Sequence, residues 1–337
     1  MIKLIRSTMT AAATIFLISS SAQSAKLIRV PQAVKSIQTA LDMAETGDTV
    51  LVSEGTYNEA ITLRDGIVLI GMSAEKTILK GKRSKPVVVG AQNAILRHFT
   101  IENGSMGILC ENVFMTIEHC VVRGNKGSGI QCLLTLPVMR NNVVFRNSWS
   151  GIFCESTRSH KGAVTNNVIA ENGYSGIMLS GHSEIVVENN IFYFNNQFGV
   201  YASEGSRRTR IIYNNFFGNR SSVNQFASLD RSNLFEDPAF MLSAPNEYDF
   251  WGSETPELRG RGKEGKDIGL LKRIFYNPQN EDTSDPAEKN PAPKVIKAVI
   301  QPANPQTTDS TQKNHINIQD SPDLSNETND PQPTENR

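Results

Sequence analysis

Three short runs in the middle of the chain, GILC, GIQC and GIFC, end at Cys110, Cys132 and Cys154. The three cysteines follow one another at intervals of 22 residues, and Cys120 is the fourth cysteine of the chain. Four thiols in an exported protein can form two disulfides. Thiolates are also ligands for soft metals such as copper. A third interpretation involves no chemistry, because cysteine often behaves as a small buried hydrophobe.

Basic side chains concentrate in two longer turns, ESTRSHKG (155–162) and SEGSRRTR (203–210), with His182 between them. Arginine and lysine bind carboxylates as hydrogen-bonded ion pairs, and a histidine can act as a general base near neutral pH. Side by side, these turns form a basic cleft that suits an acidic polysaccharide. The alternative is a set of unrelated, solvated turn residues. The predicted catalytic residues are Glu155, His160 and His182, and the predicted substrate contacts are Phe153, Arg158, Lys161, Tyr201, Arg207 and Arg208.

An internal repeat must position these residues. The glycine of the Gly-Ile pairs, with Gly199-Val200 as the last member, recurs at intervals of 22, 22, 25 and 23 residues. An Asn-Asn pair recurs in phase with it, as at Asn166-Asn167 and Asn189-Asn190. Repeats of 20–25 residues indicate a solenoid. Short β-type runs separated by Gly, Asn and Ser, without helical periodicity, predict a β-solenoid. Asparagine suits the bend between two strands, and stacked coils would align the Asn side chains in a ladder.

Strand alternation assigns a direction to each residue of the Gly-Ile-x-Cys runs. With Ile and Cys pointing inward, one outward column is Leu109, Gln131, Phe153, Met178 and Tyr201, an exposed apolar stripe that can stack on sugar rings unless a loop or the C-terminal tail covers it. Glu111 and Glu155 face outward two rungs apart, hence ~9–10 Å, near the upper limit for an inverting glycosidase pair. Two solvated surface glutamates are the simpler interpretation. Cysteines on adjacent rungs would lie ~4.8 Å apart, wider than a relaxed disulfide prefers, which favours a free core row.

The two ends of the chain differ from the repeats. Residues 1–25 combine Lys3 and Arg6 with an apolar run and a small-residue cleavage site, which predicts a signal peptide and export to the periplasm or beyond. Residues 26–276 form the predicted β-helix domain. Residues 277–337 hold nine of the 15 prolines and predict a disordered tail. Ile37, at the start of an i, i+3, i+4, i+7 apolar pattern, marks a short helix that ends by Gly47 and caps the solenoid.

The stretch SIQTALDMAETGDTVLVSEGTYNEAITLRDGIVLIG (36–71), followed by the Gly-Ile and Asn-Asn repeats, resembles the right-handed parallel β-helix proteins of the pectin lyase-like superfamily. Within it, the chain is most similar to exported bacterial proteins with NosD-like or carbohydrate-binding and sugar-hydrolase (CASH-type) domains. Residues 233–240 and 266–269 resemble the closing coil of such domains. The resemblance covers residues 29–272 and implies an all-β, right-handed parallel β-helix with a short N-terminal helix. One fold hosts many functions, so activity is implied only weakly.

Enzymes of this superfamily commonly act on acidic polysaccharides through aspartates. Here no aspartate occurs between Asp65 and Asp230, which argues against the polygalacturonase, methylesterase and epimerase mechanisms and against an aspartate-built calcium site. The leading hypothesis is binding of an acidic polysaccharide along the solenoid, extended by lyase or hydrolase processing of the bound polymer if the protein is catalytic. The alternative is a non-enzymatic accessory role, including NosD-like copper-site maturation, for which Met115, His119 and Cys120 are candidate ligands with no established spacing. No cofactor is predicted. Balanced charge, 34 acidic and 34 basic residues, indicates no nucleic-acid partner, and no membrane insertion is expected after signal cleavage.

Overall fold

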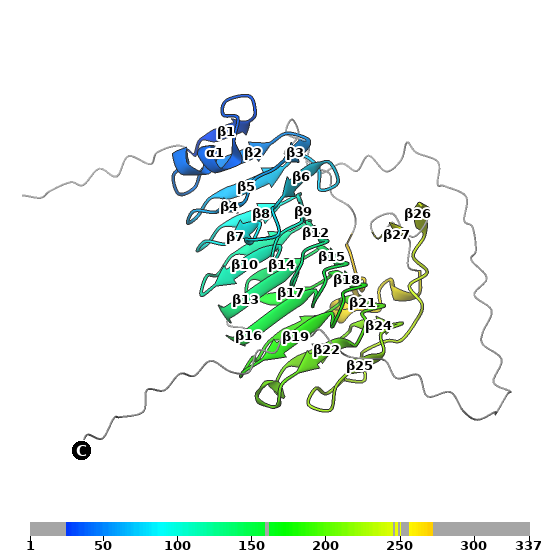
Figure 1. The fold of residues 1–337 in the computed structure, drawn as a ribbon. Helices are drawn as coiled ribbons and strands as arrows, with labels where there is room; N and C mark the ends of the chain where they lie inside the picture. Colours follow the sequence, from blue (N-terminus) through cyan, green and yellow to red (C-terminus); the bar gives the residue numbers. More distant parts are fainter. Residues whose placement is uncertain (1–24, 159–161, 245–246, 249, 251–255, 272–337) are drawn as a thin grey trace, which may run out of the picture. The chain divides into compact units, whose positions relative to one another are not determined.

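A computed structural model describes residues 25–158, 162–244, 247–248, 250 and 256–271 (Figure 1). These residues form three parallel sheets of nine, eight and eight strands and one two-stranded antiparallel sheet, β26 (Leu242–Ala244) and β27 (Glu247–Tyr248). After its first strand, the chain passes through one strand of each parallel sheet in turn. The predicted right-handed parallel β-helix is confirmed. The predicted tail, and the predicted signal peptide apart from Ala25, lie outside the described residues. Within the described part, no helix is long and apolar enough to cross a membrane.

We name the sheets A, B and C in the order in which each coil visits them. Sheet A contains β1 (Leu27–Val30), β2 (Thr49–Val52), β5 (Val68–Gly71), β8 (Ile95–Arg97), β11 (Thr116–Glu118), β14 (Val138–Arg140), β17 (Ala163–Thr165), β20 (Val186–Glu188) and β23 (Arg210–Ile212). Sheet B contains β3 (Gly55–Tyr57), β6 (Thr77–Lys80), β9 (Thr100–Glu102), β12 (Val121–Arg123), β15 (Val143–Phe145), β18 (Val168–Ala170), β21 (Ile191–Tyr193) and β24 (Asn215–Phe217). Sheet C contains β4 (Ile61–Thr62), β7 (Val88–Val89), β10 (Ile108–Glu111), β13 (Ile130–Thr135), β16 (Ile152–Arg158), β19 (Ile177–Ser180), β22 (Phe198–Ala202) and β25 (Ser221–Val223).

A short helix, α1 (Ile37–Met43), lies at the N-terminal end of the solenoid (Figure 1). Ser36 caps it by accepting a hydrogen bond from the Thr39 backbone N–H at 3.3 Å. The helix buries Ile37 against the first strands of sheets A and C. The predicted cap is therefore confirmed, although the helix ends at Met43, before Gly47, because Ala44 is already extended.

Asparagine ladders hold two of the three corners. Between sheets A and B, one Asn of each coil donates from Nδ2 to the Oδ1 of the next coil at 2.9–3.1 Å, along the series Asn142, Asn167, Asn190, Asn214 and Asn233. It is the second Asn of the pair in the first three coils, the first Asn of the pair at Asn214, and a single Asn at Asn233. The first Asn of the pair has positive φ, 54° at Asn166, as predicted for the bend. Between sheets B and C runs a second ladder that sequence reasoning did not predict, formed by Asn125, Asn147, Asn172, Asn195 and Asn219.

The C-terminal part of the described chain returns along the outside of sheet B. Its apolar side chains, Phe240, Phe250, Leu258 and Ile268, pack on the outward residues of β12, β15, β18 and β21. We call these four residues the C-terminal cover. Asn166 fixes it by donating from Nδ2 to the carbonyls of Asp267 and Gly269, both at 2.9 Å. Residues 233–240 and 266–269 were expected to close the last coil. Asn233 does end the first Asn ladder, but Phe240 and Ile268 cover the outer face of sheet B instead.

Candidate functional site

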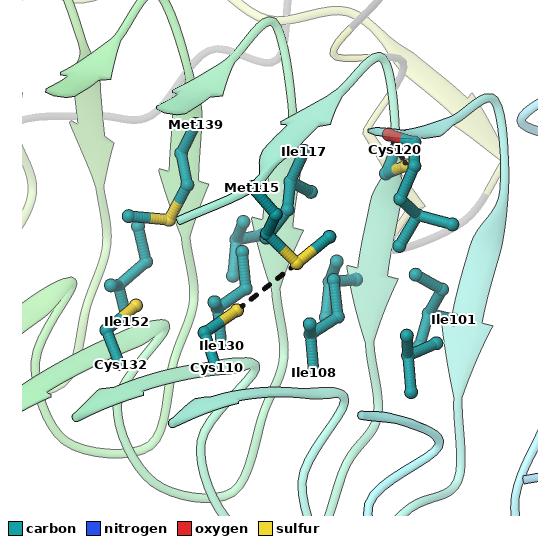
Figure 2. Close-up of a cluster of buried hydrophobic side chains, with 14 of the residues drawn as sticks. Ile101, Ile108, Cys110, Met115, Ile117, Cys120, Ile130, Cys132, Met139 and Ile152 are labelled. Carbon is teal, nitrogen blue, oxygen red and sulfur yellow. Dashed lines mark hydrogen bonds between the residues drawn. The ribbon is translucent and has the colours of Figure 1, made fainter. Parts of the chain in front are cut away.

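The cysteine row lies in the core of the solenoid. Cys110, Cys132 and Cys154 occupy the same register position on β10, β13 and β16, and Leu179 and Ala202 continue the row. All four cysteines are free and buried. Figure 2 shows the sulfur atoms of Cys110, Cys120 and Cys132 among buried isoleucine and methionine side chains. The predicted core row is confirmed, and the disulfide alternative is wrong.

The environment of the thiols suppresses their reactivity. Hydrogen bonds with the Cys110 and Cys154 thiols, together with burial, raise the pKa of Cys132 well above its usual range. Burial raises the pKa of Cys120 to about 12. Cys120 and Cys132 therefore stay protonated at neutral pH, whereas nucleophiles and metal ligands must be thiolates. Over the described ranges, no group of three or more His, Cys, Asp or Glu side chains is placed to hold a metal ion.

The outward column next to the cysteines has the predicted register. Phe153 pairs with Gln131 on one side and with Met178 on the other, and Met178 pairs with Tyr201. The expected exposure of Phe153 is wrong, because only 8% of this residue is accessible. Trp149, at the corner between sheets B and C, lies with its ring centroid 5.2 Å from that of Phe153 and partly covers it.

Together these side chains form an aromatic strip along one edge of sheet C. We define the strip as Trp149, Phe153, Tyr174, Met178, Phe198 and Tyr201. Ring centroids are separated by 6.2 Å between Tyr174 and Tyr201 and by 5.6 Å between Phe198 and Tyr201. Sequence reasoning missed Trp149, Tyr174 and Phe198, although each lies one or two residues before a repeat glycine and so at the same corner.

Glu155 lies on the second outward column of sheet C. It is exposed, and it pairs in register with Leu133 and Ser180. Glu111 is also exposed and pairs with Leu133, so the two glutamates lie two rungs apart as predicted. The exposed carboxylate of Glu155 can accept or donate a proton at the surface of sheet C, and its catalytic role stays a prediction.

His182 is exposed at the turn between sheets C and A, and hydrogen bonds beneath it order this turn. Buried hydroxyls support this corner: the Thr157 backbone N–H donates to Ser183 Oγ at 3.0 Å, and the Ser183 N–H donates to Ser206 Oγ at 3.1 Å. The next turn crosses close to His182, since a Cβ on Gly205 would lie 3.0 Å from its Cδ2 and 2.5 Å from the Gly181 carbonyl oxygen. Only glycine permits this approach.

The predicted basic cleft is described only in part. Arg207 and Arg208 are exposed on the turn above His182. Arg207 forms two local interactions. Its Nη2 lies 3.0 Å from Glu204 Oε1, in an ion pair, and its guanidinium lies 5.1 Å from the centre of the Phe226 ring. His160 and Lys161 lie outside the described residues, and only the backbone of Arg158, the last residue of β16, is described. The gathering of these basic side chains stays a prediction.

A buried carboxylate lies on the outer face of sheet A. Glu118, 3% exposed, forms ion pairs with Arg97 and Arg140 on the neighbouring rungs. Burial alone would raise its pKa, but the two guanidinium groups outweigh burial and hold the pKa below its usual range. Beside it, His98 and His119 stack with ring centroids 5.2 Å apart, in the position that Asn takes in later coils. Burial, aided by the neighbouring His119 and Arg97, lowers the pKa of His98 to about 4.

Comparison with known proteins identifies a family. The family model described as "Periplasmic copper-binding protein (NosD)" matches residues 41–239, more than half of the 337 residues. No curated protein sequence matches the chain.

Solved structures that are similar to the chain share little sequence with it. Pectate lyase Pel9A is 12% identical, with a TM-score of 0.41 over 74% of this chain and 97% of that chain. A pectin methylesterase in complex with a hexasaccharide is 10% identical, with a TM-score of 0.30 over 65% of this chain and 94% of that chain. The Azotobacter vinelandii mannuronan C-5 epimerase AlgE4 A-module is 12% identical, with a TM-score of 0.27 over 58% of this chain and 94% of that chain.

Proposed function

The chain belongs to the periplasmic copper-binding protein (NosD) family, and we propose that it acts after export by binding an acidic polysaccharide along sheet C. The observation that carries this proposal is the aromatic strip. Its side chains extend over three successive coils, which stack ~4.8 Å apart, so they offer a continuous apolar surface parallel to the solenoid axis. Extended apolar patches of this kind mark binding faces, and aromatic rings stack on flat apolar surfaces such as the faces of sugar rings.

Exposed basic residues at the opposite edge of sheet C support an acidic ligand. His182 and Arg208 are exposed on the turns that follow β19 and β22. An arginine binds a carboxylate through two parallel hydrogen bonds, which adds orientation to attraction. If the bound chain is also cleaved, Glu155 is the acid or base that we propose, with His182 and His160 as the alternative bases. Phe153, only 8% exposed, then acts mainly by supporting Trp149.

Copper, the metal in the family description, does not fit the donors that the described residues present. The row thiols are spaced one coil apart along a line, so they do not converge on one point as the ligands of a metal ion must. Each is fully buried, and hydrogen bonding and burial raise the pKa of the central thiol. The contact of 3.6 Å between Cys110 Sγ and Met115 Sδ joins two core side chains (Figure 2). The proposed function therefore does not involve copper.

Trp149 provides a direct test, because the chain contains only two tryptophans, Trp149 and Trp251. In a Trp251→Phe background, fluorescence reports on Trp149 alone. Titration with polygalacturonate or alginate is expected to shift this emission, whereas neutral dextran leaves it unchanged. No shift with any uronate polymer, together with no retention on immobilised polymer, rules out the proposal.

Variants then place the binding on the strip. Trp149→Ala and Tyr201→Ala are expected to weaken polymer binding by about tenfold each, the effect of losing 1–1.5 kcal/mol of ring contact. Phe235→Ala removes an equally aromatic side chain that is 57% exposed on the last coil, and it is the matched control that retains affinity. Release of unsaturated or reducing ends by the wild type, lost in Glu155→Gln with binding retained, would establish catalysis as well.

A further inference from the structure

A hollow of about 300 Å³ opens on the outer face of sheet B, away from the aromatic strip. Four of its lining residues pair in register on neighbouring strands of sheet B and so form one outward column. The other three lie in the turns that follow these strands. The lining residues are Lys80, Glu102, Asn103, Arg123, Gly124, Phe145 and Arg146. The hollow lies where the outward residues of sheet B change from apolar to charged, beside the end of the C-terminal cover.

The lining carries a net positive charge, and ion pairs hold its charged side chains in place. Glu102 lies between two cations on neighbouring rungs, with its Oε1 3.7 Å from Lys80 Nζ and its Oε2 3.2 Å from Arg123 Nε. Arg146 Nε lies 2.5 Å from Oε2 of Glu171, a carboxylate outside the lining. Three cations are therefore paired with two carboxylates, which leaves a net charge of +1 (three minus two), and the ion pairs hold the cations in place.

One wall of the hollow is aromatic and fixed. Phe145 is 6% exposed because Phe250 of the C-terminal cover packs against it edge-on, with ring centroids 5.5 Å apart. The guanidinium of Arg146 lies 5.6 Å from the centre of the same ring. The hollow thus combines a flat apolar edge with hydrogen-bond donors, the usual composition of a site for a small polar ligand.

Gly124 creates the space. It follows β12, in the position that Asn103 takes after β9 and Arg146 takes after β15, and all three have positive φ, of 61°, 61° and 50° respectively. A Cβ at Gly124 would meet nothing within 4 Å. The backbone does not need glycine here, since its neighbours in the column adopt the same conformation with side chains. What glycine adds is the room between Asn103 and Arg146.

We propose that this hollow binds a single carboxylated sugar, a hexuronate unit. The carboxylate would pair with Arg123 and Arg146, whose forked N–H groups match its geometry. Glu102 and the Asn103 Oδ1 would accept hydrogen bonds from hydroxyls, since Asn103 uses its Nδ2 on the Gly81 carbonyl at 2.8 Å. The volume is at the lower end for ligand sites, which suits one ring rather than an oligomer. No residue is shared with the aromatic strip, so this site does not depend on the proposed function.

The test is titration of the full chain with D-glucuronate, monitored by calorimetry or NMR. D-glucose is the uncharged control ligand, and inorganic sulfate is the anionic control ligand that is not a sugar. We expect glucuronate to bind more tightly than either. Arg146→Gln removes a charge-assisted contact and is expected to weaken glucuronate binding by at least about tenfold. Lys126→Gln, which removes an exposed cation two residues from Gly124 and outside the lining, is the matched control and leaves affinity within about twofold.

Gly124→Asn is the decisive variant, because it fills the hollow without removing a charge. Asparagine tolerates this backbone conformation, as Asn103 shows one coil earlier, so the fold is retained. Loss of glucuronate binding in this variant supports the site. Unchanged binding in Gly124→Asn, equal affinity for glucose or sulfate, or an equal loss in Lys126→Gln overturns it. Trp149→Ala keeps glucuronate affinity, which separates failure of this site from failure of the aromatic strip.

Discussion

Asn167 sits in the middle of the first Asn ladder, and replacing it with alanine should be among the most destabilising single changes in the solenoid. Its Nδ2 donates to the Met139 carbonyl at 2.9 Å, the Thr165 carbonyl at 3.0 Å and the next ladder amide at 2.9 Å. Its Oδ1 accepts from the backbone N–H of Asn142 at 2.9 Å and from the Asn142 Nδ2 at 3.0 Å. Asn167 itself is fully buried.

The magnitude follows from these contacts. The Asn142 backbone N–H loses its partner in a buried corner, which costs about 1–3 kcal/mol. The four other bonds contribute roughly 0.5–1.5 kcal/mol each, and contributions within one network do not add in full. We expect Asn167→Ala to lower the free energy of unfolding by about 3–6 kcal/mol. Backbone strain does not contribute, because the positive φ belongs to Asn166.

Urea unfolding followed by circular dichroism measures this loss. Asn196→Ala is the matched control: it removes an exposed asparagine from a neighbouring corner with one side-chain bond, 3.2 Å to the Gly173 carbonyl, and should cost at most about 0.5 kcal/mol. A loss below about 1 kcal/mol for Asn167→Ala, or equal losses for both variants, would show that the ladder is not what holds the corner.

Three further outcomes are expected. Cys132→Ala leaves a small cavity and lowers stability by about 1–3 kcal/mol while polysaccharide affinity is retained; lost affinity in a folded variant would place the thiol row in the site. A Cu(I) competition titration of the reduced protein is expected to find no site tighter than in a variant lacking all four cysteines, and a tighter stoichiometric site would contradict our assignment of the row to the core. Because the pKa of His98 is lowered to about 4, the folded state resists protonation, so stability is lost as pH falls from the unfolded pKa of about 6.5 toward 4. Replacing His98 and His119 by Asn, the residue that occupies their position in later coils, should remove about 1–3 kcal/mol of this pH dependence in urea midpoints, and an unchanged pH profile would show that the histidines do not carry it.

Much of the fold was predictable because a solenoid turns sequence period into spatial neighbourhood. Residues one coil apart, such as Cys110 and Cys132, must lie side by side on adjacent rungs, and strand alternation then assigns Leu109 and Glu111 to the outside. The Asn-Asn pair predicts the bend and the ladder, because asparagine accepts the left-handed conformation and its amide can bond to its own copy. The second ladder carries a similar signal in one Asn per coil, most of them outside an Asn-Asn pair, and was missed in the sequence.

The tertiary structure decided how exposed each position is and what lies beside it. Trp149 packs over Phe153, and Phe250 packs against Phe145, which lies more than 100 residues earlier in the chain. Neither contact follows from the repeat, because Trp149 lies at a corner and Phe250 lies in a segment outside the periodic strands. Sequence alone therefore determined the coil, the inward row and the register of the outward columns. Which outward column is covered, which forms an aromatic strip and which leaves a hollow at Gly124 depended on long-range packing that no local pattern encodes.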